Sequence, residues 1–339
     1  MPEPSVHPLH HVGWSERVQA LFAALGAEGF LPARVVGVER GWCHLATPTG
    51  ERSLPVPGTV VGDWVALDGD RLVEMLPRWS TLGRLDPGGG RQLLAANLDL
   101  ALITAPADRL SSARVERELV IAWDSGARPL VVVTKLDVAP PGAIDDLSGR
   151  LGPVDLIATS SLTGDGLDEL RTHLLHPITA ALLGPSGAGK STLINALLGE
   201  DRLEVGAVRG EDHRGRHTTT SRQLVPLPSG GSLIDMPGLR SLGTDATDDA
   251  LAAAFPEIDE LATGCRFADC GHDVEPGCAV VAAAEVGELD PARLASYRKL
   301  LRETAFERRR VDPRARKEEL RVWKARTKAQ RRIYREREP

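Results

Sequence analysis

Hydrophobic and polar positions alternate in two different ways along this chain. Between residues 32 and 85, short β-type runs at 33–39, 42–47, 60–67 and 72–76 are separated by turn residues such as Gly, Pro and Asp. Several short strands with close turns predict a small barrel. A five-stranded OB-type barrel, which commonly binds nucleic acid, fits this length. Ahead of it, residues 16–25 followed by Gly26 predict one short helix, to which we assign no role.

From residue 97 onward the pattern becomes that of an α/β fold. Near-continuous apolar strands are predicted at 99–104, 130–134, 155–160, 180–183 and 233–234. Helical stretches lie between several of them, for example 113–125, with Gly126 just beyond its end. Such strands, alternating with helices, indicate a parallel sheet covered on both faces. After residue 245 the pattern is helical, with a helix expected from about Pro291.

Composition narrows the class of protein without deciding it. The 339 residues are 42% hydrophobic and 26% charged, which is ordinary for globular proteins and argues against disordered, collagen-like and coiled-coil classes. No run approaches the ~18 apolar residues of a spanning helix, and no signal peptide is visible, so we expect a cytoplasmic protein with no membrane partner.

Charge is unevenly distributed along the chain. The net charge is −6, yet the segment from Arg298 onward holds 17 Lys and Arg against seven Asp and Glu. A basic tail on an acidic body suggests a polyanionic partner. The bland alternative is a solvated charged helix, and a membrane-surface helix is disfavoured by its thin apolar face.

A phosphate-binding loop follows the strand predicted at 180–183. The eight residues are Gly184-Pro185-Ser186-Gly187-Ala188-Gly189-Lys190-Ser191, and Thr192 continues into a helix. They fit G-x-x-x-x-G-K-[ST] between a strand and a helix, which is the context this motif requires. Backbone N–H groups and the helix N-terminus would cradle the phosphates. We expect Lys190 to reach the β/γ-phosphates as a catalytic group and Ser191 to ligate Mg²⁺.

Two further segments complete a nucleotide switch. Asp235-Met236-Pro237-Gly238 is a D-x-x-G placed 44 residues after Ser191. We expect Asp235 to hold Mg²⁺ and the Gly238 N–H to contact the γ-phosphate. Between the two motifs lies a polar loop, Gly215-Arg216-His217-Thr218-Thr219-Thr220. One of its threonines would close over Mg²⁺; we take Thr219, although spacing alone does not decide among them.

Base selection is predicted upstream rather than downstream of the phosphate loop. Thr134-Lys135-Leu136-Asp137 ends one predicted strand, and Ser160-Ser161 ends the next. Asp137 would accept hydrogen bonds from guanine N1 and N2, and a backbone N–H at Ser160 or Ser161 would read O6. All motifs sit at carboxyl ends of predicted strands, where open α/β sheets bind ligands. The base motifs precede the phosphate motifs, so the order is that of a circularly permuted GTPase domain.

A cluster of metal-ligating residues follows. Cys265-x4-Cys270-x-His272-x5-Cys278 supplies three thiolates and one imidazole. This Cys₃His set suits a closed tetrahedral zinc site with a structural role. The alternative is a group of buried or redox cysteines. The fourth cysteine, Cys43, stands alone in the β region, where an inert core position is expected.

These segments resemble, in the same order, the circularly permuted ribosome small-subunit-dependent GTPase A (RsgA) family. The likeness runs from about residue 32 to 310. The segments that match are 94–99, Thr134–Asp137, 184–192, 215–220, 235–238 and the Cys/His cluster. It implies an OB-type barrel at 32–90, a permuted GTPase domain at 91–245 and a helical zinc domain at 246–310. Residues 1–31 and the basic tail, 311–339, are less typical.

The resemblance also implies an activity. Members assist late maturation of the small ribosomal subunit, whose rRNA they contact and which stimulates their GTP hydrolysis. The base motif usually begins with Asn, where this chain has Thr134, and Leu239 follows the D-x-x-G where many GTPases place a water-orienting Gln. The resemblance offers His217 as a substitute; the alternative is an exposed loop histidine.

The predicted function is therefore a GTPase that binds GTP/GDP, Mg²⁺ and one structural Zn²⁺, as a monomer. Two alternatives stay open. One is an ATP-using P-loop kinase or ATPase, which Asp137 disfavours. The other is an RNA-binding module whose P-loop binds nucleotide without hydrolysing it.

Overall fold

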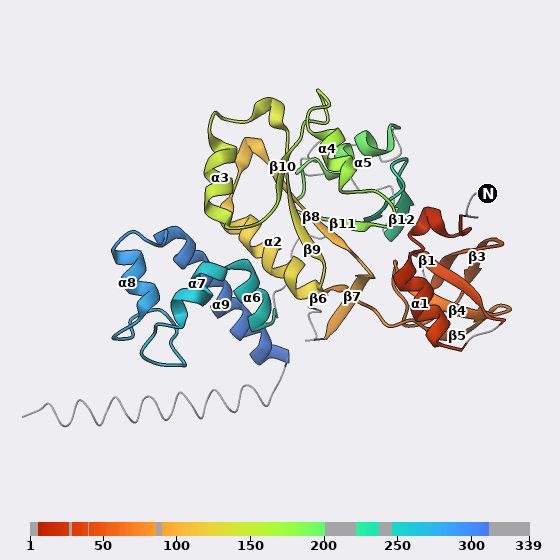
Figure 1. Ribbon diagram of the computed structural model, residues 1–339, viewed down its shortest axis with the longest axis horizontal. Coiled ribbons are helices and arrows are strands. Elements are labelled where there is room, and N and C mark those ends of the chain that lie inside the picture. Colours follow the sequence, from red (N-terminus) through yellow and green to blue (C-terminus); the bar gives the residue numbers. More distant parts are fainter. Residues whose placement is uncertain are drawn as a thin grey trace, which may run out of the picture.

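The computed structural model describes residues 6–26, 29–39, 41–85, 90–200, 222–236 and 246–311. A strand-rich unit, a central α/β sheet and a helical unit follow one another, with the first and the last on opposite sides of the central sheet (Figure 1). The basic tail predicted to contact RNA lies outside the described residues. Within them, no helix has both the length and the apolar character needed to cross a membrane.

The central sheet is parallel over five strands, in the order β10-β9-β8-β11-β13. Its strands are β8 (Leu100–Pro106), β9 (Arg128–Thr134), β10 (Leu156–Ala158), β11 (Thr179–Leu183) and β13 (Ser232–Asp235), with β12 (Arg222–Pro226) antiparallel beside β13. Every residue of β8 and β11 is buried, as the continuous apolar runs predicted. The expected α/β fold is confirmed.

Helices cover this sheet on both faces (Figure 1). They are α2 (Ser112–Ser125), α3 (Ala143–Leu151), α4 (Leu167–Thr172) and α5 (Lys190–Leu198), with short 3₁₀ turns η2 (Ala107–Arg109) and η3 (Leu136–Val138) after β8 and β9. Helix α2 ends where predicted, at Gly126 with φ +83°. A Cβ there would come within 3.1 Å of the Trp79 carbonyl oxygen, so glycine serves both the turn and the packing.

The N-terminal unit is barrel-like, with five strands among its described residues. They are β1 (Leu31–Glu39), β2 (Trp42–Thr47), β3 (Gly50–Leu54), β4 (Trp64–Asp68) and β5 (Arg71–Met75). Strand β1 pairs with β2, with a bulge between Val35 and Gly37, and its first four residues also pair with β4. Cys43 lies in the core of this unit, as expected, with its Sγ 3.0 Å from the Thr59 hydroxyl.

Two details of the barrel prediction were wrong. Strand β3 was missed because Glu51, Arg52 and Ser53 are polar, which suits an exposed edge strand. The strand predicted at 60–67 begins only at Trp64, because residues 60–63 form a turn in which the Asp63 carboxylate accepts the Val60 N–H at 2.8 Å. Gly62, with φ +95°, sits in this turn against the Ala96 carbonyl.

A hairpin joins the barrel to the central sheet. Its strands, β6 (Thr81–Leu85) and β7 (Arg91–Ala96), pair antiparallel and were not predicted. They lie on either side of the domain border expected at residue 90. The two units also share a sheet, because β1 pairs with β12 at Gly37 and Val38.

The N-terminal segment packs between the barrel and the sheet. It contains η1 (His10–Val12) and α1 (Glu16–Ala24), whose cap is the Ser15 hydroxyl accepting the Val18 N–H. The Trp14 ring meets the Trp64 ring edge to face, and the Trp14 carbonyl lies 2.8 Å from His176 Nε2. A segment without an assigned role in the sequence thus links the first two units.

The helical unit contains α6 (Asp248–Ala254), α7 (Pro256–Ala262), α8 (Ala279–Glu285) and α9 (Pro291–Val311). Helices α6 and α9 pack against α2 of the central domain. At their junction Arg293 of α9 pairs with Glu116 of α2, and both side chains are almost fully buried. The C-terminal unit is therefore anchored to a helix that covers the central sheet.

Candidate functional site

The phosphate loop joins β11 to α5 and is shaped by close packing at its first residue. Gly184 has φ +134°, and a Cβ there would lie 2.1 Å from the Thr104 hydroxyl oxygen. That hydroxyl donates to the Leu183 carbonyl at 2.7 Å, so β8 holds the loop's entry. Gly189, with φ +81°, is the N-cap of α5. The predicted strand–loop–helix context is confirmed.

The Lys190 side chain folds back onto this loop. Its Nζ donates to the carbonyl oxygens of Gly184 at 2.8 Å and Pro185 at 2.7 Å. Burial lowers the pKa of Lys190, while the charges of Glu118 and Asp235 act in the opposite direction. The ammonium group is therefore held by weak neutral acceptors, and phosphate oxygens would be stronger partners.

Two carboxylates act on this cation through their charge. Asp235 ends β13, the neighbour of β11, and burial raises its pKa although Lys190 opposes the rise. Glu118 comes from α2, and burial raises its pKa to about 7 against the pull of Lys190. Asp235 was predicted from its motif. Glu118 was not, because one glutamate on a helix carries no spacing signal.

The base motif contacts the phosphate loop directly. The buried Thr134 hydroxyl donates to the Ala188 carbonyl oxygen at 2.7 Å. Threonine thus supplies a side-chain contact to the loop at the position where the family pattern usually has asparagine. Lys135 follows with φ +59°, a left-handed conformation that turns the chain into η3.

The structure brings the two predicted base segments together. The Ser160 hydroxyl donates to Asp137 Oδ1 at 2.6 Å, and its oxygen accepts the N–H groups of Leu162 and Thr163. The Leu136 N–H donates to the Thr159 carbonyl at 3.0 Å. Asp137 is thereby oriented by the segment expected to read the other edge of the base.

Several predicted site residues lie outside the described residues. These are the switch loop with His217 and Thr219, and Gly238 of the D-x-x-G motif. Asp235 and Ser191 are described, so one predicted magnesium carboxylate and one predicted hydroxyl are placed. The third predicted ligand, Thr219, is not.

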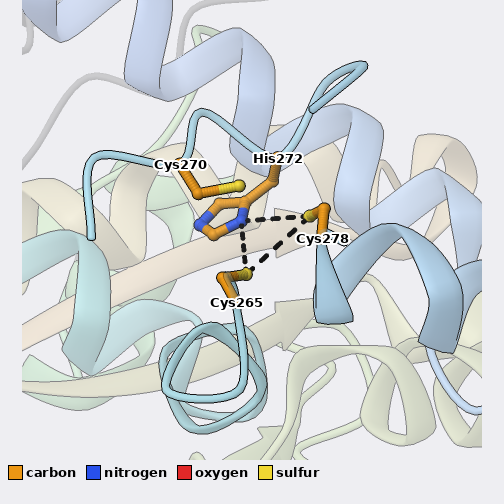
Figure 2. Close-up of side chains that lie close together, drawn as sticks. All are labelled: Cys265, Cys270, His272 and Cys278. Carbon is orange, nitrogen blue, oxygen red and sulfur yellow. Dashed lines mark hydrogen bonds between the residues drawn. The ribbon is translucent and has the colours of Figure 1, made fainter. Parts of the chain in front are cut away.

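The Cys/His residues form a compact ligand set. Cys265, Cys270, His272 and Cys278 bring their ligand atoms within 4.8 Å of one another, and Figure 2 shows the thiols gathered around the imidazole. The Cys265 and Cys278 sulfurs are 3.9 Å apart, and His272 Nδ1 lies 3.6 and 3.5 Å from them. Bonds of ~2.3 Å to sulfur and ~2.0 Å to nitrogen in a tetrahedron give separations of roughly 3.5–3.8 Å. These residues fit zinc.

Backbone N–H groups and burial favour the metal-binding protonation states of these residues. Cys278 is the N-cap of α8 and its Sγ accepts the Val281 N–H. Burial opposes ionisation of Cys265, but hydrogen bonds from the N–H groups of Val280 and Ala279, together with those from the Cys278 and Cys270 thiols, lower the pKa of that thiol. Burial also lowers the pKa of His272, which favours the neutral imidazole that binds metals.

The Glu275 carboxylate stabilises the loop that carries His272. Glu275 accepts the N–H groups of Gly271, Asp273 and Val274. These bonds lower the pKa of Glu275 and shape the turn around His272, whose φ is +54°. Glu275 could not be predicted from the sequence, since its role depends on turn geometry rather than on ligand chemistry.

Together, these features define a class of protein. A phosphate loop, a neighbouring Asp235 and a base motif meet at the carboxyl edge of one parallel sheet, although the base motif comes first in the chain. This is a P-loop nucleotide-binding domain in permuted order, flanked by a barrel-like unit and a metal-binding helical unit.

Comparison with known proteins extends this assignment. Residues 75–245 match the model of the RsgA GTPase family. The chain is 45% identical to a small ribosomal subunit biogenesis GTPase RsgA of Streptomyces avermitilis, covering 94% of this chain and 92% of the relative. It is 43% identical to the protein of the same name in Streptomyces coelicolor, covering 96% of each. The chain belongs to the RsgA GTPase family.

Solved structures agree on the fold. The crystal structure of YjeQ from Thermotoga maritima superposes with a TM-score of 0.63 at 24% identity, over 81% of this chain and 98% of that one. YloQ, described as a circularly permuted GTPase, gives 0.59 at 24% identity, over 81% and 95%. The permuted GTPase fold predicted from the motif order is confirmed.

Proposed function

We propose that this chain hydrolyses GTP to GDP and phosphate, stimulated by the small ribosomal subunit, whose late maturation it assists. The observation that carries the proposal is the hydrogen bond from Thr134 to Ala188. It joins the base motif to the phosphate loop within one site, in a chain whose relatives are named small ribosomal subunit biogenesis GTPases.

The residue roles follow from chemistry and position. The N–H groups of the phosphate loop, from Gly184 to Thr192, would hold the phosphates, and Lys190 would move from its carbonyl partners to the β/γ-phosphates. Ser191, Asp235 and Thr219 would hold Mg²⁺, which supplies charge neutralisation on the phosphates. Gly238 would contact the γ-phosphate, and His217 would take the place of the missing glutamine.

The base site would select guanine. Asp137, held by the Ser160 hydroxyl, would accept the N1 and N2 protons, which adenine cannot offer in that arrangement. Lys135 and Leu136 would line the base, and the backbone N–H of Ser161 would meet O6, because that of Ser160 donates to the Asp165 carbonyl oxygen at 3.0 Å. Ser160 supports this role because its side chain already fixes the carboxylate.

The metal residues would hold one structural Zn²⁺. Three thiolates and one imidazole fill a tetrahedral shell and leave no position for a water or substrate. Their ligand separations support zinc. We therefore assign zinc to the folding of the C-terminal unit rather than to hydrolysis.

We further propose how the parts work together. The division into an extension (1–31), barrel (32–90), GTPase domain (91–245), zinc unit (246–310) and tail (311–339) is retained, with the β6–β7 hairpin as the joint between barrel and GTPase domain. The barrel and basic tail would contact rRNA. The protein would act as a monomer in the cytoplasm, where small subunits mature.

A nucleotide titration and a turnover assay test this function. Affinities for GTP, GDP and ATP are measured first, and hydrolysis is then followed with and without purified small subunits, with Lys190→Ala as the inactive reference. We expect guanine preference and turnover that rises when subunits are added. A preference for ATP would instead indicate a P-loop kinase or ATPase. Binding without turnover in the presence of subunits would indicate an RNA-binding module with a nucleotide switch.

A further inference from the structure

A short turn beside the phosphate loop carries two charged residues that the site described so far does not use. Turn η2 follows β8, next to η3 of the base motif. Its Arg109 donates from Nη2 to the Gly187 carbonyl oxygen at 3.1 Å and, more weakly, to that of Ser186 at 3.5 Å. An arginine from a neighbouring strand end therefore holds the apex of the phosphate loop.

The same turn contacts the base motif. Asp108 Oδ2 lies 2.8 Å from Lys135 Nζ, and Asp108 Oδ1 lies 3.8 Å from Arg109 Nε. The hydrogen bond from Lys135 keeps the pKa of Asp108 below its ordinary value, so the carboxylate is ionised at neutral pH. The chain of contacts runs from Lys135 through Asp108 and Arg109 to Gly187.

Peptide geometry gives these contacts a consequence for phosphate binding. A peptide unit is planar, so a carbonyl fixed in one direction points the N–H of the next residue in the opposite direction. Arg109 holds the carbonyls of Ser186 and Gly187, and this orients the N–H groups of Gly187 and Ala188. Thr134 holds the Ala188 carbonyl and orients the N–H of Gly189. The directions of three consecutive N–H groups are thus fixed before a nucleotide arrives. That of Ala188 donates to the Pro185 carbonyl oxygen at 3.3 Å, so Gly187 and Gly189 supply the donors that we expect to meet phosphate.

We propose that Arg109 is a positioning residue of the nucleotide site, which preorganises the phosphate loop and, through Asp108, couples it to Lys135 of the base motif. This inference rests on the proposed function. Preorganised donors bind a ligand more tightly because less ordering is needed on binding. Because the contact is made to loop carbonyls and not to the nucleotide, we expect it to be the same with GTP, GDP and the transition state, so that its loss weakens binding and leaves the chemical step unchanged.

The test compares Arg109→Ala with a matched control. Arg128 is the first residue of β9, so it lies at the amino ends of the strands, away from the phosphate loop. It pairs with Asp155 at 3.4 Å, and its side chain is 55% exposed, against 53% for Arg109. Affinities for GDP and GTP are measured by fluorescence titration. For Arg109→Ala we expect both affinities to fall about fivefold, as for one partly exposed charge-assisted hydrogen bond. Arg128→Ala should leave both affinities unchanged.

Further measurements separate positioning from general stability. In subunit-stimulated hydrolysis, Arg109→Ala should raise KM about fivefold with kcat unchanged. Arg109→Lys should recover part of the affinity. In a double-mutant cycle with Lys135→Ala, the two losses should be less than additive, because each removes part of the same chain of contacts.

Three results would overturn the inference. They are an unchanged nucleotide affinity in Arg109→Ala, an equal loss in Arg128→Ala, and strictly additive losses in the cycle. The proposed function fails separately, by an absence of guanine-nucleotide binding or turnover in the unaltered protein. If the unaltered protein hydrolyses GTP and Arg109→Ala matches it, only the role of Arg109 is lost.

Discussion

Replacing Arg293 with methionine should destabilise the protein strongly, because this arginine neutralises a buried carboxylate between two units. Its Nη1 lies 3.1 Å from Glu116 Oε1, and Nη2 donates to the Ala254 carbonyl at 2.9 Å and to Glu257 at 3.2 Å. The guanidinium also stacks over the Phe255 ring at 4.6 Å. The Arg293 and Glu116 side chains are only 5% and 2% exposed.

The magnitude follows from what the substitution leaves behind. Methionine keeps much of the packing volume but leaves the Glu116 carboxylate buried without its cationic partner. Removing one partner of a buried ion pair typically costs about 3–5 kcal/mol. We expect a loss of that size in the free energy of unfolding at neutral pH.

The loss should depend on pH in a defined direction. Burial raises the pKa of Glu116 above 4.5, while hydrogen bonding from Ser296 and the charge of Arg293 restrain the rise. Without Arg293 the folded-state pKa rises further, so the folded protein takes up a proton that the unfolded chain releases. Stability then falls as pH increases through the interval between the unfolded and the folded pKa. The deficit should be smallest near about pH 5 and largest near about pH 8.

Urea unfolding followed by circular dichroism, at both pH values, measures this deficit. Arg52→Ala is the control, since its pair with Asp70 is exposed and should contribute less than about 1 kcal/mol. The double variant Arg293→Met/Glu116→Gln should recover part of the loss, because no charge is stranded. A deficit below about 1 kcal/mol, or one that does not change with pH, would refute the reasoning.

Three further predictions concern the nucleotide site, the metal and the tail. Asp137→Asn should weaken GTP binding at least about tenfold and admit xanthine nucleotides, whose position 2 accepts a hydrogen bond; unaltered GTP affinity in a titration would remove Asp137 from the base site. Cys270→Ser should lower bound zinc, measured by atomic absorption, and unfold residues 246–311 while GDP binding persists; a metal-free yet folded unaltered protein would contradict the zinc assignment. Deleting residues 312–339 should weaken subunit binding and flatten its salt dependence, since fewer counterions are released; an equal slope with and without the tail would argue against rRNA contact there.

Short motifs allowed much of the site to be predicted from the sequence. The phosphate loop, Thr134–Asp137, Asp235 and the four Cys/His ligands each depend on residue types at fixed local spacing, and the structure brings each group together as expected. The parallel sheet was predicted for a related reason, because strands buried on both faces must be apolar along their whole length. The permuted order then followed from the positions of the motifs alone.

Other features were decided by tertiary structure. Strand β3 and the β6–β7 hairpin carry polar or mixed residues, and they are strands only because a partner strand lies beside them. The pairing of β1 with β12 brings together segments almost 190 residues apart. No local sequence pattern predicts such a contact, since the free energy that stabilises the strand pair comes from the distant partner strand.

The charged residues around the site show the same division. Lys190 and Asp137 were identified because each occupies a fixed position in a known motif. No motif surrounds Glu118, Asp108, Arg109 or Arg293, which lie in ordinary helices and turns. Their importance arises from the charge or carbonyl that the fold places opposite each one. The chemistry of a motif depends on a few adjacent residues, so it can be predicted from the sequence. Burial and pairing depend on distant segments, so only the folded chain determines which charges are neutralised and which carbonyls are held.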